Sequence, residues 1–118
     1  MLLSLFLLGA VQMSPPVAAS ASAIPRAASN VTQIRAGRQL AIENCQVCHA
    51  VGRRGRSPNA SAPQFRYLAR RYPVENLSEA FAEGILVGHS VMPQFEFAPE
   101  QVTGLVAYLK SIQVPSPV

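Results

Sequence analysis

The stretch "ENCQVCHAVG", residues 43–52, holds both cysteines of the 118-residue chain, Cys45 and Cys48, with His49 directly after them. A helical pattern of apolar residues leads into this stretch, and a loop with several glycines and prolines follows it, so the two thiols lie at the end of a helix. Two cysteines at this spacing occur in redox dithiols, in zinc sites and in covalent anchors for haem. The residues elsewhere in the chain indicate which of these is formed.

Zinc and a dithiol each leave part of the motif unexplained. A structural zinc ion needs four ligands, and after residue 23 the chain offers Cys45, Cys48, His49 and His89. Cys48 and His49 are neighbours, so both cannot easily turn toward one tetrahedral ion. A thioredoxin-like dithiol needs a preceding strand, whereas the pattern here is helical. A disulfide between Cys45 and Cys48 would close a small, strained ring and would add little to the stability of the fold.

Covalent haem accounts for every residue of the motif. The two thiols can add to the two vinyl groups on one edge of the porphyrin, and His49 then lies over the iron as the proximal ligand. Met92 is the only methionine after residue 23, and it stands outside any helical period. Pro93 favours an extended backbone at Met92, which suits a side chain projected from a loop as the distal ligand. His89 is the alternative distal ligand.

The N-terminus has the pattern of an export signal. Residues 1–13, "MLLSLFLLGAVQM", carry an apolar run, and two prolines and the small-residue stretch "VAASASA" follow. We expect a signal peptide over residues 1–23, cleaved after Ala21 or Ala23, and a periplasmic protein. The run is shorter than the about 20 apolar residues that span a bilayer. An uncleaved membrane anchor at residues 1–13 is the alternative, since no Lys or Arg precedes the run.

The rest of the chain predicts one all-α domain over residues 32–113, between an N-terminal tail at 24–31 and a C-terminal tail at 114–118. Three or four short helices joined by long loops bury little apolar surface, so another group is expected in the core. The helices are expected from Thr32 to Cys45, over "QFRYLARRY" (64–72), over "VENLSEAFAEG" (74–84), and from Pro99 to Ile112.

The charge is basic and unevenly placed. Nine Arg and one Lys against six Glu give a net charge of +4, and six of the arginines fall within residues 53–71. Such a cluster either docks an acidic protein or an anionic surface, or is a solvated face. Nothing in the sequence resembles a groove-reading motif, so a nucleic-acid partner is not expected.

From Thr32 to Ile112 the sequence closely resembles the class I cytochrome c family, of the small bacterial type. "GRQLAIENCQVCHAVG" is similar to the first helix of that family, with Gly37 eight residues before Cys45. "LVAYLK", residues 105–110, is similar to its last helix, whose aromatic residue, here Tyr108, packs across that glycine. "APQF" and "MPQF" are similar to the segments that carry Pro63 and the axial Met92.

The resemblance implies a fold whose first and last helices cross, with loops around one covalent haem c. It implies thioethers at Cys45 and Cys48, iron ligands at His49 and Met92, and a carbonyl of Pro63 that holds the histidine ring. The implied function is a non-enzymatic single-electron carrier that docks redox proteins at the haem edge, without a small-molecule substrate. A subunit of a larger oxidoreductase, and a haem enzyme or sensor whose distal ligand is labile, are the alternatives.

Overall fold

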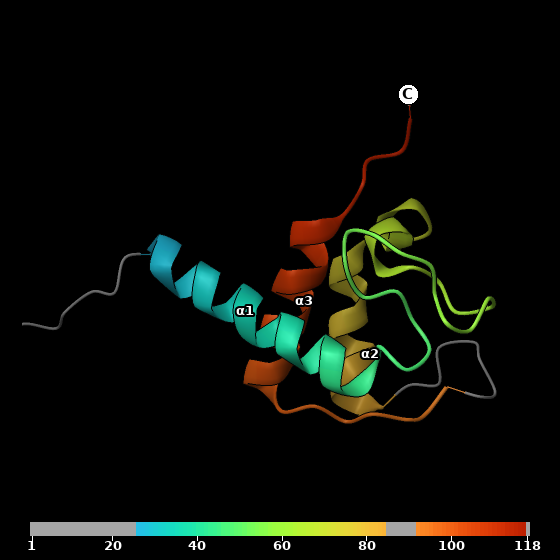
Figure 1. The fold of residues 1–118 in the computed structure, drawn as a ribbon. Coiled ribbons are helices and arrows are strands. Elements are labelled where there is room, and N and C mark those ends of the chain that lie inside the picture. Colours follow the sequence, from blue (N-terminus) through green and yellow to red (C-terminus); the bar gives the residue numbers. More distant parts are fainter. Residues whose placement is uncertain (1–25, 85–91, 118) are drawn as a thin grey trace, which may run out of the picture.

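The computed structural model describes residues 26–84 and 92–117, and in these ranges every regular element is a helix (Figure 1). The all-α prediction is therefore confirmed. The predicted signal peptide and the alternative ligand His89 lie outside the described residues. The α-helices are α1 (Arg26–Asn44), α2 (Leu77–Glu83) and α3 (Pro99–Ile112), and two 3-10 helices, η1 (Phe65–Arg70) and η2 (Val74–Asn76), precede α2.

Helix α1 begins earlier than the sequence indicated. It starts at Arg26 rather than at Thr32, so the predicted tail at 24–31 is helical from Arg26 onward. Alanines 27 and 28 are strong helix formers, and no glycine or proline lies between Arg26 and Gly37. The predicted domain boundary at residue 32 thus falls inside α1. None of the described helices is long and apolar enough to cross a membrane.

Helices α1 and α3 cross with their backbones in contact (Figure 1). A Cβ atom added to Gly37 would lie 1.9 Å from the carbonyl oxygen of Gly104 and 2.8 Å from the backbone nitrogen of Leu105. We expected Tyr108 to pack over Gly37, but the nearest atoms belong instead to Gly104 and Leu105. Tyr108 lies one turn further along α3, where its hydroxyl donates to the carbonyl of Val51 at 2.7 Å.

Helix α3 begins at Pro99, as predicted, without a serine or aspartate cap. The side chain of Gln101 replaces the cap, since its Oε1 atom accepts the backbone N–H of Ala98 at 2.9 Å. The helix turns its apolar face inward, and Leu105 and Leu109 are the largest fully buried side chains. This face packs with residues from α1, the turn and loop that follow it, η1, η2 and α2 into one core: Ala41, Cys45, Val51, Phe65, Leu68, Val74 and Leu77.

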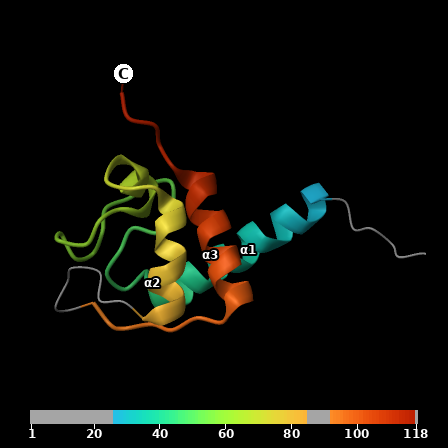
Figure 2. The ribbon, with the colours of Figure 1, turned by 180° about the vertical axis from the view of Figure 1, so that it is seen from behind.

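Helix α2 lies beside α3 (Figure 2) and ends as predicted at Gly84. Gly84 has a left-handed backbone with φ 71°, and its N–H donates to the carbonyl of Ala80 at 3.0 Å, which closes the helix. The described chain resumes at Met92 and runs without regular structure to α3. The N–H of Phe97 donates to the carbonyl of Phe81 at 2.9 Å, so this segment is tied to α2.

Candidate functional site

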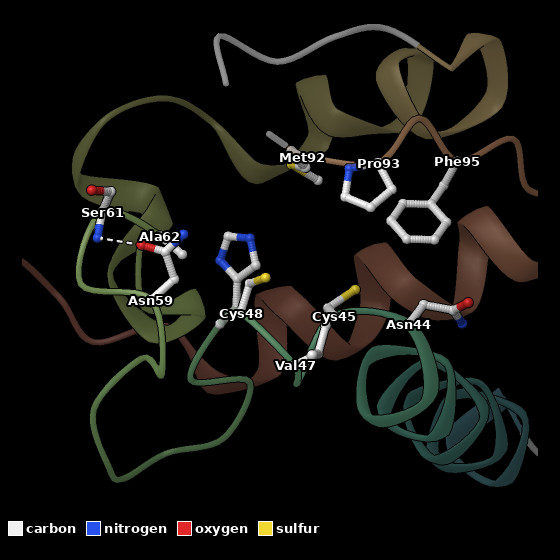
Figure 3. A pocket seen from close by; sticks show the side chains of 11 residues that line it. Asn44, Cys45, Val47, Cys48, Asn59, Ser61, Ala62, Met92, Pro93 and Phe95 are labelled. Carbon is white, nitrogen blue, oxygen red and sulfur yellow. Dashed lines mark hydrogen bonds between the residues drawn. The ribbon is translucent and has the colours of Figure 1, made fainter. Parts of the chain in front are cut away.

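The two cysteines and His49 lie on one turn that continues α1. The N–H of His49 and the N–H of Cys48 both donate to the carbonyl of Cys45, at 2.9 and 3.2 Å. Figure 3 shows the sulfur atoms of Cys45 and Cys48 directed from this turn toward the segment that carries Met92. Both cysteines are free, so no disulfide joins them. The turn therefore presents two thiols and an imidazole together, as covalent attachment of one group requires.

These side chains share a cavity with Met92. Cys45, Cys48, His49 and Met92 line an empty space of about 510 Å³. A second space of about 840 Å³ shares three of these residues with the first, and it reaches the core between η1, α2 and the segment after Met92. The second is walled largely by apolar side chains: Phe65, Leu68, Leu77, Phe81, Phe95, Phe97 and Leu109.

His49 is held in one orientation. Its side chain is 8% exposed, and its Nδ1 lies 2.7 Å from the carbonyl oxygen of Pro63. A carbonyl only accepts, so Nδ1 carries the proton and donates it to this bond, and Nε2 keeps its lone pair. The ring of Phe65 packs on the imidazole with centroids 4.9 Å apart. This is the contact with Pro63 that the family resemblance implies.

A hydrogen bond between Phe65 and Ala50 keeps Pro63 in place. The N–H of Phe65 donates to the carbonyl of Ala50 at 3.0 Å, and Ala50 directly follows His49. The segment that carries Pro63 is thereby joined to the turn that carries the imidazole. The donor and the acceptor of the His49–Pro63 bond thus belong to one small hydrogen-bonded unit.

Cys45 is a buried and protonated thiol. Burial raises the pKa of Cys45 to about 11 from 9.0. Reactive and redox-active cysteines have lowered pKa values and electropositive surroundings, so Cys45 lacks the character of a thioredoxin-like nucleophile. Among the described residues, no group of three or more His, Cys, Asp or Glu side chains is placed to hold a metal ion. The raised pKa of Cys45 is thus unlike that of a redox-active dithiol.

Aromatic rings support the wall that carries Met92. The rings of Phe95 and Phe97 stack with centroids 5.7 Å apart, and Phe97 meets Phe81 of α2 edge-on at 6.1 Å. The side-chain amide of Gln94 also donates to the carbonyl of Gly84. No role was expected for Phe95 and Phe97 from the sequence, although the alternation in "QFEFAP" indicates that the two side chains face the same way.

Polar side chains mark one end of the larger space. Arg71 is the one cationic residue in its described lining, and Tyr72 lies beside it. Burial raises the pKa of Tyr72, so its hydroxyl stays protonated and can donate. Arg71 also lines a smaller outer pocket with Pro63 and Gln64, which places it at the rim. The sequence had grouped Arg71 with five other arginines and gave no sign of this position.

The residues present fit a haem group attached through two thioethers. Two thiols lie beside an imidazole with a free Nε2, a thioether lines the same cavity, and the walls are mostly apolar. The arginine at one end suits the acidic substituents of a porphyrin.

The comparisons with known proteins give one match. The family model described as Cytochrome c matches residues 34–113, which include most of α1, all of α3 and the residues of both cavities. No curated protein and no solved structure matches the chain.

Proposed function

The chain belongs to the cytochrome c family, and on that premise we propose that it carries single electrons with one covalently bound haem c. The observation that supports this most strongly is the shared cavity of Cys45, Cys48, His49 and Met92. In this proposal Cys45 and Cys48 would form the thioethers, His49 would hold the iron through Nε2, and Met92 would hold it through sulfur. When bound, the haem iron accepts and returns one electron.

The chain's own residues would tune and protect this group. The carbonyl of Pro63 accepts the Nδ1 proton of His49, which fixes the ring and makes Nε2 a stronger donor. The apolar side chains around the larger space exclude water and raise the reduction potential. Arg71, with Tyr72, would hold the acidic substituents of the porphyrin at the polar end.

The proposed role needs no catalytic residue. With His49 and Met92 both holding the iron, no position would remain on it for a substrate, and no general acid or nucleophile would be required. The carrier would act in the periplasm after removal of residues 1–23 and would exchange electrons with redox proteins. A place as the haem c subunit of a larger oxidoreductase is compatible with the same site and differs in its stable partners, which co-purification would detect.

A spectrum of the protein from a host competent in c-type maturation tests the proposal. We expect covalent haem that survives denaturing electrophoresis and a low-spin, six-coordinate spectrum with the ferric sulfur-to-iron band. An open or labile distal position, which an enzyme or sensor would have, gives instead a high-spin fraction and rapid binding of carbon monoxide to the reduced protein.

The distal ligand is tested by two separate variants. Met92→Ala should abolish the sulfur-to-iron band and lower the potential by roughly a tenth of a volt or more, within the ~0.8 V range that axial ligands set. The control is His89→Ala, the alternative ligand, which should leave band and potential unchanged. If His89→Ala removes the six-coordinate spectrum and Met92→Ala does not, the assignment of Met92 is wrong.

A further inference from the structure

A second cleft lies next to the haem cavity and is separate from it. It opens to solvent between α1, the loop of residues 50–58 and α3. Among the described residues, His49 is the one that this cleft shares with either part of the haem cavity. The cleft therefore reaches the proximal histidine from outside the space that the haem would fill.

The cleft is lined by three arginines and no acidic residue. Arg38 comes from α1, and Arg54 and Arg56 come from the loop, so two distant parts of the chain bring the guanidinium groups together. All three are exposed, and the one ion pair formed by the described residues is Lys110–Glu75, elsewhere on the molecule. Five of the six glutamates lie in residues 75–100, away from this part of the sequence. We name Arg38, Arg54 and Arg56 the basic cleft.

The other arginines near this loop already contact other parts of the protein. Arg53 donates to the carbonyl of Ser111 at 2.8 Å, and the buried Arg66 donates to the carbonyl of Gly55 at 2.8 Å. The guanidinium of Arg70 lies over the ring of Tyr67, 4.2 Å from its centroid. The sequence cluster at 53–71 is therefore not one surface. Its members either anchor the loop, pack elsewhere, or face the basic cleft.

Hydrogen bonds within the protein hold the loop that carries Arg54 and Arg56 in one conformation before any partner binds. Gly55, between them, has φ 90°, a conformation that favours glycine, and its carbonyl is held by Arg66. The N–H of Ala50 donates to the hydroxyl of Ser57 at 3.0 Å, which closes the loop on itself. A preformed site loses less conformational entropy when it binds.

We propose that the basic cleft docks an acidic surface of a redox partner protein, on the His49 side of the haem and not at the thioether edge. The inference rests on the proposed function for the redox nature of the partner. Guanidinium groups pair with carboxylates in a planar, two-pronged geometry, and three of them that form no salt bridge among the described residues favour a surface rich in Asp and Glu. The concave shape fits a protruding protein surface better than a flat membrane.

The experiment measures binding of an oligoglutamate peptide to the reduced, haem-loaded protein by NMR. Shifted amide signals should gather at Arg38, Gln46 and Gly52. The variant Arg54→Gln/Arg56→Gln should weaken binding roughly tenfold at low salt, as loss of two exposed ion pairs predicts. Its control is Arg70→Gln/Lys110→Gln, which removes the same net charge outside the cleft and should change affinity less than twofold.

Three results would overturn the proposal. Equal weakening in both double variants would mean that net charge alone attracts the peptide. Shifts centred on Met92 and Phe95 would place docking at the thioether edge. Binding to phosphatidylserine vesicles that is lost in the Arg54/Arg56 variant, without peptide binding to the native protein, would make the cleft a membrane contact.

Folding and the proposed function are checked separately. Arg38→Gln alters the cleft from α1 and leaves the loop intact, so it should also weaken peptide binding even if the loop variant misfolds. Peptide binding needs no electron transfer. Absence of the expected haem spectrum would therefore overturn the proposed function and the redox nature of the partner, but not the docking of an acidic surface, whereas absence of cleft-specific binding would overturn this inference alone.

Discussion

Hydrogen bonds hold the wall of the haem cavity that carries His49, whereas aromatic rings hold most of the wall that carries Met92. On the histidine side, Nδ1 donates to Pro63 and the neighbouring Ala50 pairs with Phe65 and Ser57. On the methionine side, Phe81, Phe95 and Phe97 pack ring against ring, with few backbone bonds between them.

The difference matters because the two kinds of contact constrain the chain differently. Hydrogen bonds are directional, so the imidazole is oriented before any group is bound. Ring packing is less directional, so the methionine wall can adjust to what fills the cavity. We therefore expect the histidine side to be preformed and the methionine side to depend more on the bound haem.

The largest effect should come from removing both thiols. Cys45→Ala/Cys48→Ala should abolish covalent haem and strongly reduce the amount of protein in the cell, because the apolar walls then enclose no group. Haem staining after denaturing electrophoresis and the yield of folded protein measure this. A stable, folded, haem-free double variant at normal yield would show that neither wall needs the haem.

The next effect concerns the crossing on which both walls rest. Gly37→Val places its Cβ 1.9 Å from the carbonyl oxygen of Gly104, a backbone atom that cannot yield without moving α3. We expect a loss of ~3 kcal/mol in the free energy of unfolding, at the upper end of overpacking costs. The matched control is Gly52→Ala, whose Cβ would have nothing within 4 Å. Equal denaturant midpoints for the two variants would contradict the crossing.

Two variants with smaller effects should show directly how the histidine side and the methionine side of the cavity differ. Phe97→Leu removes one ring from two aromatic pairs and should cost about 1–2 kcal/mol, and added imidazole should displace Met92 more easily. Ser57→Ala removes one bond from the histidine side and should cost about 1 kcal/mol, without any change in that displacement. Titration of the ferric spectrum with imidazole compares them. Equal sensitivity in both variants would remove the proposed difference.

The smallest effect concerns the ion pair between α3 and η2. Lys110 lies 2.7 Å from Glu75, and it holds the pKa of that carboxyl below its usual 4.5. A lowered folded-state pKa stabilises the protein above pH 4.5, and this contribution disappears as the pH falls through the folded pKa. Lys110→Gln should therefore show a small loss at neutral pH that vanishes in acid. A loss that persists in acid would point to packing of the lysine stem.

Much of this architecture is readable from local signals in the sequence. Cys45, Cys48 and His49 define their own turn, and Pro99 and Gly84 mark a helix start and a helix end because of their backbone requirements. The family resemblance adds Pro63, whose carbonyl does lie against His49. These positions depend on neighbours in the chain or on a recurrent motif, so one sequence suffices.

Other positions depend on contacts between distant segments and carry no local mark. In the sequence, a glycine within a helical pattern, such as Gly104, indicates only a lower helix propensity. Its contact with Gly37 is visible only in the tertiary structure. The arginines are equally alike in sequence, yet Arg66 anchors a loop, Arg71 lines the haem cavity and Arg54 faces the basic cleft. Burial and partners, not residue type, separate these roles.

The crossing of α1 and α3 also sets the order of events during synthesis. The contact joins Gly37 to Gly104, near opposite ends of the domain, so the chain cannot close until nearly all of it has emerged. Until α3 packs against α1, the turn of Cys45 and Cys48 is not covered by it, so both thiols stay accessible. Contacts so far apart in the chain also slow closure. We therefore expect that a ribosome-bound chain that ends before Pro99 leaves both cysteines open to modification.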